Sequence, residues 1–248
     1  MFPPVTSYDG DGPYPTTTVD GVGPNGGFTV VRPKELGPGG LIHPVLTWGN
    51  GTATITAQYA PLLGRLASYG FVIIATSSTA TGTGQEMLQG VDWLLSENIT
   101  KGSDYFGKLD PANIGATGHS QGGGGTINAG FDPRIKAIAP IEPVPGTKAP
   151  HGPMLLLCGG LDTVVNATGI CGALIYNYSA VPTFFGIQDA ATHFTPTTFN
   201  GPTNAFMAPL TAWFRYHLMG DQPAKAMFYG DACGLCADPH WAVQRKNL

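Results

Sequence analysis

Ten residues near the middle of the chain, Ala116 to Gly125, most constrain the folds open to this sequence. They read Ala-Thr-Gly-His-Ser-Gln-Gly-Gly-Gly-Gly, so Gly118 to Gly122 is a G-x-S-x-G stretch. An apolar run from Ile114 to Ala116 precedes it, and the small residues from Gly122 to Ala129 are suited to opening a helix. In a strand–turn–helix elbow the serine is strained, and a Cβ on either side would strike the adjacent strand and helix. The stretch therefore predicts a nucleophile elbow at Ser120; the alternative is a glycine-rich turn that happens to hold a serine.

The composition favours a folded protein with a weakly charged surface. The chain has 248 residues, of which 42% are hydrophobic and only 11% charged, against about a quarter charged in typical domains. Such a surface is what we expect outside the cell. The first residues, Met1 to Pro4, lack the basic and apolar regions of a signal peptide. This start fits the mature part of a secreted protein, and it also fits a cytosolic one.

Several partner classes have no support in the sequence. The net charge is −4 and no cluster of Lys and Arg exceeds Arg245-Lys246, so we expect no nucleic-acid partner. No apolar run reaches the length of a membrane span. Gly21 to Gly26 matches G-x-G-x-x-G, but it precedes a predicted strand and contains a proline, so we interpret it as a turn. We expect no cofactor and no metal, and a monomer.

Apolar strands alternate with helical patterns along most of the chain, which predicts one doubly wound, mostly parallel α/β sheet in a single domain without a large lid. The domain covers residues 1–248, with an extended N-terminal segment at 1–26 and a C-terminal tail at 221–248 that contains Cys233 and Cys236. Strands are expected at 28–32, 42–48, 71–75, 114–116, 135–141, 154–158 and 183–188. Helices are expected at 56–69, 86–98, 122–129, 168–178 and 204–219.

A serine nucleophile needs a base and an acid that orients the base, and in this kind of elbow the order is Ser, acid, His. Asp162 follows the apolar strand 154–158 and a Gly-Gly turn, and is our choice for the acid. Its alternative role is to cap the next helix. Glu142, after the strand that follows the elbow, is the rival acid.

His193 is our choice for the base, because it lies in the loop after the last predicted strand. His119 belongs to the elbow and is expected to point away from the active face of Ser120. His217 lies on the inward side of a helix, where a hydrogen-bonded core histidine is expected. The remaining histidines lie in the tail (His240) or at strand starts, the wrong end of a parallel sheet (His43 and His151).

An oxyanion hole needs two N–H donors. The backbone of Gln121, directly after the nucleophile, is the expected first donor. The second should come from the loop after an early strand, here 49–52. Asn50 is preferred, and Gly51 and Thr52 stay open as alternatives.

Four cysteines favour structural disulfides. Cys233 and Cys236 form a C-x-x-C in the tail, where neither a redox site nor a zinc site is expected. Cys158 and Cys171 are the other two partners, and three pairings remain possible.

The elbow, Gly118 to Gly124, resembles the G-H-S-M-G-G-G elbow of the bacterial cutinases and polyester hydrolases, a group that includes enzymes degrading poly(ethylene terephthalate) (PET). Leu66 to Ile73 resembles their L-A-S-x-G-F-V-V stretch, and Leu109 to Gly115 resembles their turn into the nucleophile strand. The segments at Asp162 and at Thr192 to Phe194 also match. The likeness covers residues 26–220. It implies an α/β-hydrolase fold with Ser120, Asp162 and His193 as the catalytic triad and Gln121 as an oxyanion donor.

The chain departs from that family around the substrate. Gln121 stands where the family has Met, the loop after Gly49 is longer, and Val144 stands where the family has Trp. Two aromatic surfaces are therefore missing or moved, and Trp48 and Phe194 are the candidates to replace them. Val164 falls near the family's Ile after the acid. The expected substrate-binding residues are accordingly Trp48, Gly51, Thr52, Val144, Val164 and Phe194.

We therefore expect a secreted serine ester hydrolase that acts on polyesters or cutin-like esters through an acyl-enzyme on Ser120, with PET as one candidate substrate. The alternative within the fold is a small-molecule carboxylesterase or a dienelactone-hydrolase-like enzyme, although a serine nucleophile argues against the latter. A non-catalytic domain of this fold would have lost a triad member, and all three are present.

Overall fold

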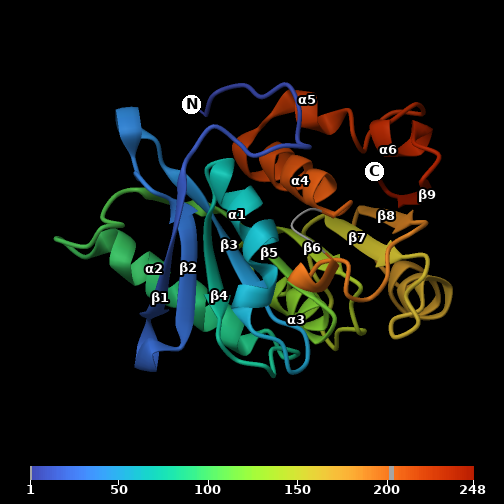
Figure 1. The fold of residues 1–248 in the computed structure, drawn as a ribbon, viewed down its shortest axis with the longest axis horizontal. Helices are drawn as coiled ribbons and strands as arrows, with labels where there is room; N and C mark the ends of the chain where they lie inside the picture. Colours follow the sequence, from blue (N-terminus) through green and yellow to red (C-terminus); the bar gives the residue numbers. More distant parts are fainter. Residues whose placement is uncertain (1, 201–203) are drawn as a thin grey trace.

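A computed structural model shows that the described residues form one mixed sheet of nine strands (Figure 1). The structure describes residues 2–200 and 204–248; Met1, the first residue of the expected domain, and residues 201–203 lie outside it. The strands follow in the spatial order β1-β2-β4-β3-β5-β6-β7-β8-β9. Their bounds are β1 Thr16–Val22, β2 Phe28–Pro33, β3 His43–Gly49, β4 Val72–Thr76, β5 Leu109–His119, β6 Ile135–Ile141, β7 Met154–Gly159, β8 Thr183–Gln188 and β9 Trp241–Lys246.

The centre of the sheet is parallel and its two sides are antiparallel. Strands β3 to β8 pair in parallel, whereas β2 and β1 on one side and β9 on the other run antiparallel to their neighbours. The central strands β3, β4 and β7 are buried along their whole length. This agrees with their continuous apolar runs, which are typical of strands covered on both faces. The predicted doubly wound, mostly parallel sheet is confirmed.

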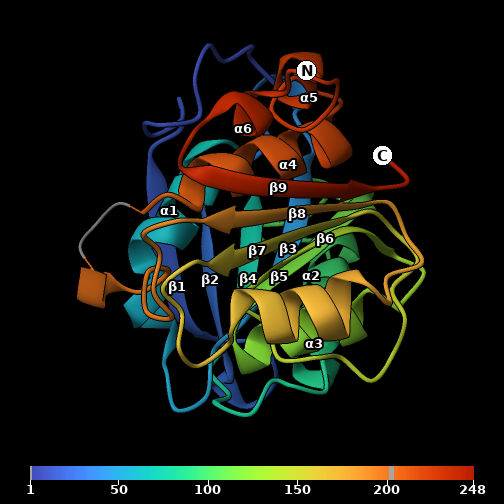
Figure 2. The same cartoon turned by 90° about the vertical axis from the view of Figure 1, so that its right-hand side faces the viewer.

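Helices cover both faces of the sheet (Figures 1 and 2). One face carries α1 and α4, whose Leu62, Leu66, Trp213 and Phe214 join one core cluster. The other face carries α2, α3 and the π-helix η4, whose side chains join a second cluster. The bounds are α1 Ala60–Ser68, α2 Gln85–Ile99, α3 Gln121–Ala129, η4 Ala167–Tyr176, α4 Met207–Met219, α5 Gln222–Lys225 and α6 Gly234–Ala237, with short 3-10 turns η1 Pro24–Gly26, η2 Pro38–Gly40, η3 Thr56–Tyr59 and η5 Thr198–Asn200.

None of the helices in residues 2–200 and 204–248 has the length and apolar character needed to cross a membrane.

Two edge strands differ from the expectation of irregular terminal segments. Residues 16–22 form β1 and residues 241–246 form β9, which Figure 2 shows beside β8. Both strands alternate between exposed and partly buried residues. An edge strand buries little and tolerates polar side chains, so neither segment carries the apolar run that identified the inner strands.

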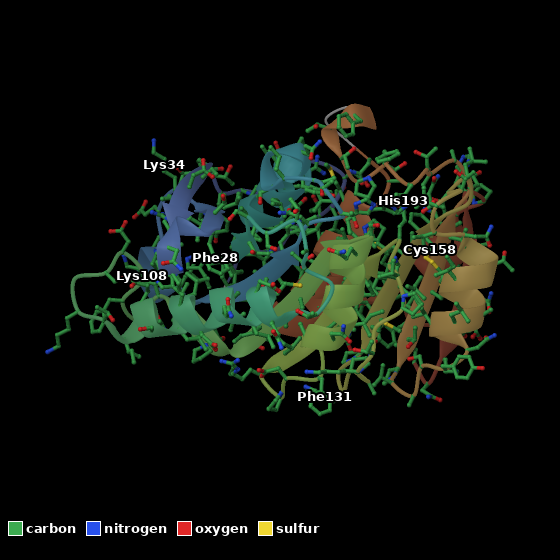
Figure 3. All side chains as sticks on the ribbon, turned by 90° about the horizontal axis from the view of Figure 1, so that it is seen from below. Phe28, Lys34, Lys108, Phe131, Cys158 and His193 are labelled. Carbon is green, nitrogen blue, oxygen red and sulfur yellow. A yellow bond between two sulfur atoms is a disulfide. The ribbon has the colours of Figure 1, made fainter. Side chains whose placement is uncertain are left out.

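The two disulfides resolve the pairing that the sequence left open. Cys158 of β7 bonds to Cys171 of η4, and Figure 3 shows Cys158 beside that gold helix. Cys233 bonds to Cys236 at the start of α6. The first bond ties η4 to the sheet, and the second closes the short turn before β9.

Gly122→Ala tests the close backbone contact between α3 and β3. A Cβ at Gly122 would overlap the backbone carbonyl of Gly49, where α3 crosses β3. We expect a loss of about 3 kcal/mol or more in the free energy of unfolding, the upper range for overpacking. Gly64→Ala in α1 is the matched control, because nothing lies within 4 Å of its Cβ; it should gain up to about 1 kcal/mol. Urea unfolding measures both, and equal effects would contradict the close contact.

Candidate active site

Ser120 lies at the sharp turn between β5 and α3. Its φ of 56° and ψ of −117° are strained for a residue with a side chain. A Cβ at Gly118 would clash with the carbonyl oxygens of Gly122 and Gly49, so glycine is required on both sides of the serine. The Ser120 N–H donates to Ile141 O of β6 at 3.0 Å, which ties the turn to the neighbouring strand. The elbow geometry expected from the sequence is present.

Ser120, His193 and Asp162 form a chain of hydrogen bonds. His193 Nε2 lies 3.0 Å from Ser120 Oγ, and His193 Nδ1 lies 2.8 Å from Asp162 Oδ2. A carboxylate can only accept, so Nδ1 carries the proton and Nε2 accepts from the serine hydroxyl. All three side chains are buried, with exposed fractions of 4–8%. They come from the carboxyl ends of β5, β7 and β8, the edge where parallel sheets hold their sites.

Asp162 is held by its own turn. Its Oδ1 accepts the N–H groups of Val164 and Val165 at 2.7 and 2.8 Å, which leaves Oδ2 for the histidine. The helix cap considered as its alternative role belongs to Asn166, whose side chain accepts from the first N–H groups of η4. The structure therefore places Asp162 as the partner of His193.

The other histidines outside the elbow do not hydrogen-bond to Ser120. His43 is bonded to Gly70 O and Gly37 N, His151 to Asp132 O, and exposed His240 to Asp189. His217 packs on Trp213, but its Nε2 has no partner among the described residues, so the expectation that it is hydrogen-bonded is wrong. Burial, with a contribution from Lys136, lowers the pKa of His217 to about 4.

His119 lies beside the proposed base, contrary to the expectation that it points away from the active face. The ring centroids of His119 and His193 are 4.7 Å apart. Its Nδ1 lies 2.9 Å from the hydroxyl of Tyr59. Burial, together with His193, lowers the pKa of His119 to about 3, so this imidazole is neutral.

Glu142, the rival acid, is a buried carboxyl behind His119. It follows β6 with a φ of 45° and is fully buried. Its Oε2 lies 3.3 Å from His119 Nε2, and neither oxygen has a hydrogen-bond partner among the described residues. Burial, together with the charge of Asp162, raises the pKa of Glu142 to about 9. Glu142 is therefore a neutral acid at pH 7.

The described residues include one group of side chains that could together ligate a metal. The ligand atoms of His119, Glu142 and His193 lie within 4.8 Å of one another. Metal ligands must be deprotonated, whereas Glu142 holds its proton and both nitrogens of His193 are already hydrogen-bonded. This group is therefore poorly suited to a metal centre.

The loop after β3 is built around buried polar groups. The side chain of Asn50 accepts a hydrogen bond from Trp48 Nε1 and donates one to Thr76 O, and both hydrogen bonds are buried. The Gly51 N–H donates to the Tyr59 hydroxyl at 3.2 Å. Exposed Thr52 has an N–H with no hydrogen-bond partner in the described part of the chain, and the same holds for the Gln121 N–H at the first position of α3.

Trp48 is not at the cleft as expected; it is fully buried and packs on Tyr59 at 4.8 Å. Of the other expected substrate-binding residues, Gly51 is buried and four are exposed: Thr52, Val144, Val164 and Phe194. Phe199 makes an edge contact with Phe194, with 6.2 Å between the ring centroids, and Phe194 in turn contacts His193. The sequence analysis did not name Phe199. The signal for it was an apolar residue in the same loop as the expected base, His193. Exposed Leu161, beside Asp162, was missed in the same way.

The sheet order and the elbow with its Ser–His–Asp hydrogen bonds define the class as an α/β-hydrolase. Residues 7–236 match the family described as PET hydrolase-like, and the chain belongs to that family. Cutinase est2 of Thermobifida alba is 28% identical over 225 residues, which are 86% of this chain and 71% of that protein. Cutinase 2 of Thermobifida cellulosilytica is 27% identical over 209 residues, 79% of this chain and 75% of that protein.

Bis(hydroxyethyl) terephthalate hydrolase of Streptomyces coelicolor is 28% identical over 189 residues, 71% of this chain and 57% of that protein. These comparisons confirm the resemblance carried by the elbow. They identify the protein as a carboxylic ester hydrolase.

The raised pKa of Glu142 predicts a stability that falls with pH. Below pH 4.5, its ordinary pKa, the carboxyl is protonated in both states. Between there and about 9 the unfolded chain releases the proton and the folded protein keeps it, so unfolding is favoured as pH rises. Glu142→Gln should remove this loss. Its Tm advantage over the wild type should grow from pH 5 to pH 8.

Glu35→Gln is the control for that experiment, because Glu35 is exposed and the change removes the same charge. It should show no such trend. A Glu142→Gln protein that becomes less stable than the wild type as pH rises would mean that Glu142 is ionised and paired with His119.

Proposed function

We propose that the protein hydrolyses cutin-like esters and polyesters through an acyl-enzyme on Ser120. The hydrogen-bond chain from Ser120 through His193 to Asp162 is the observation that carries this proposal. The relatives named as cutinases and as bis(hydroxyethyl) terephthalate hydrolase support the substrate class.

The reaction follows from the tautomer of His193. Its unprotonated Nε2 takes the proton of Ser120 Oγ as the oxygen attacks the ester carbonyl. Asp162 accepts from Nδ1 and stabilises the imidazolium that forms. The tetrahedral intermediate then collapses, and Nε2 returns the proton to the departing alcohol. Water, deprotonated by the same nitrogen, attacks the acyl-enzyme and releases the acid and free Ser120.

We assign the two oxyanion donors to the N–H groups of Gln121 and Thr52. Gln121 opens α3 directly after the nucleophile, where helix N–H groups lack intrahelical partners. Among the three loop candidates, the Gly51 N–H already donates to the Tyr59 hydroxyl, and Asn50 is fully buried whereas Thr52 is exposed. Thr52 has no such commitment, so the geometry favours it over Asn50.

The substrate contacts are proposed to lie on the loops around Ser120. Val144 donates its N–H to Ser120 O, and Val164, two residues after Asp162, donates its N–H to Asp162 Oδ1. Phe194 and Phe199 offer exposed ring surface beside His193. Phe194 and Phe199, rather than Trp48, would contact the substrate in place of the aromatic residues that the family has and this chain lacks.

We further propose that the chain is a secreted monomer and folds as one domain. The two disulfides support secretion, because disulfides persist in oxidising compartments. The continuous nine-stranded sheet, closed by β9 from the C-terminal segment, supports a single folding unit.

Ser120→Ala tests the nucleophile. We expect the turnover of p-nitrophenyl butyrate to fall by about 10⁴-fold or more, since a triad without its nucleophile retains only binding and oxyanion stabilisation. A fluorophosphonate probe should label the wild type at Ser120 and leave the variant unlabelled. Near-full activity of Ser120→Ala would end the proposal.

The double variant Phe194→Ala/Phe199→Ala tests the aromatic surface. We expect the release of soluble products from a polyester film to fall several-fold, on the order of 1–2 kcal/mol of lost ring contact. Hydrolysis of p-nitrophenyl butyrate should change less than about twofold, because a short ester offers the rings much less surface than a polymer chain does.

Phe131→Ala is the control for the film assay, since Phe131 is exposed at the opposite end of the molecule from His193 (Figure 3). It should leave both rates unchanged. A wild type that turns over short esters but releases nothing from films of aliphatic or aromatic polyester would identify a small-molecule carboxylesterase instead.

A further inference from the structure

A second chain of buried polar groups runs behind the catalytic residues, centred on the hydroxyl of Tyr59. This oxygen lies 2.9 Å from His119 Nδ1, 3.2 Å from the Gly51 nitrogen and 2.9 Å from Thr54 Oγ1. Tyr59 itself is fully buried at the end of η3, and burial raises the pKa of its hydroxyl. The neutral hydroxyl therefore joins three partners from two separate parts of the chain.

The donors and acceptors in this chain can be assigned from chemistry. Thr54 Oγ1 lies 2.8 Å from Gly51 O and must donate to it, because a carbonyl only accepts. Thr54 Oγ1 is then free to accept the Tyr59 proton. The Gly51 N–H donates to Tyr59, and the remaining contact requires His119 to donate from Nδ1.

His119 Nε2 is accordingly unprotonated, in keeping with the lowered pKa of this ring. It faces the Glu142 carboxyl at 3.3 Å, the longest contact of the chain. Glu142 holds its proton at neutral pH. The five members of this chain, Glu142, His119, Tyr59, Thr54 and Gly51, are thus neutral. Each hydrogen bond between His119 and Gly51 has a single assignment of donor and acceptor.

This chain bridges the two halves of the proposed oxyanion hole. His119 precedes Ser120 in the elbow, and the first donor, Gln121, follows it by two residues. Gly51 directly precedes Thr52, the second donor. The Tyr59 hydroxyl is bonded to the His119 side chain on one side and to the Gly51 N–H on the other. Its position therefore sets the spacing between the elbow and the loop.

The loop needs such support because its backbone is strained. Ala53 has a φ of 57°, unusual for a residue with a side chain. A Cβ at Gly51 would lie 3.0 Å from His119 Nδ1 and 3.1 Å from the Tyr59 oxygen, so a larger residue there would crowd this close approach. The strained residue, Ala53, lies between Gly51 and Thr54, and the Tyr59 hydroxyl is hydrogen-bonded to both of these residues.

We propose that Tyr59 is a positioning residue, which through His119 and Gly51 holds the Thr52 N–H at the distance from Gln121 that an oxyanion requires. The proposal rests on the proposed function, since it presumes ester hydrolysis at Ser120. Neither Tyr59 nor His119 touches the substrate. Their effect is on the oxyanion, which exists only in the transition state and the tetrahedral intermediate, so it should appear in kcat rather than KM.

Tyr59→Phe removes the bridging oxygen and nothing else. We expect kcat for p-nitrophenyl butyrate to fall about 10- to 100-fold. This is no more than the fall in kcat that follows the removal of one oxyanion donor. KM should change less than about threefold. The Ki of an alkyl trifluoromethyl ketone, whose hemiketal oxygen occupies the oxyanion hole, should rise by the same factor as kcat/KM falls.

Tyr69→Phe is the matched control. Tyr69 is equally buried, and its hydroxyl bonds to Ser7 O and Gly10 O, away from the elbow. It should lose stability without losing kcat. His119 supplies a second test: His119→Asn keeps an N–H donor near the position of Nδ1 and should recover most of the kcat that His119→Leu loses.

The outcomes separate this inference from the proposed function. If Ser120 is not the nucleophile, the wild type itself fails to react with a fluorophosphonate and Ser120→Ala stays active. Suppose that the wild type reacts with the probe, but that Tyr59→Phe has the same kcat and the same Ki for the ketone as the control Tyr69→Phe. The positioning role of Tyr59 is then overturned. A fall in kcat with an unchanged ketone Ki would overturn it as well.

Discussion

The contact between α3 and β3 at Gly122 and Gly49 is the constraint on which the rest of the site depends. Backbone meets backbone there, with no room for a side chain on either glycine. That approach lets β5 turn into α3 within one residue, and it forces Ser120 into a strained conformation. The same turn directs the first N–H groups of the helix towards the serine. The proposed nucleophile and the proposed oxyanion donor are thus positioned by the same close packing of α3 on β3.

The two carboxyls near His193 differ because their surroundings differ. Asp162 and Glu142 both follow central strands, and both lie close to the imidazoles. Asp162 accepts two backbone N–H groups and faces Nδ1 of His193. Glu142 accepts none and keeps its proton. The charge of Asp162 adds to the effect of burial in raising the pKa of Glu142, and the hydrogen bonds within the turn at Asp162 leave its Oδ2 facing His193.

The proposed substrate contacts are assembled differently from the proposed reacting groups. The proposed reacting groups come from strand ends that the sheet fixes, whereas Val144, Val164 and Phe194 belong to the loops beyond them and Phe199 to the short turn η5. Loops change composition without disturbing the sheet. Val144 can therefore stand after β6, and the rings of Phe194 and Phe199 after β8, without a change in the sheet.

The sequence by itself determined the elbow, the inner strands and the order Ser120, Asp162, His193, because each lies next to an apolar run or a glycine turn whose cause is local. It did not reveal β1 and β9, since edge strands need no apolar pattern. Tertiary structure decided the depth of Trp48, the partner of each cysteine, the neutral state of Glu142 and the bridge through Tyr59. These depend on which residues distant in sequence share a water-excluded space, and only the packing of the whole chain sets that.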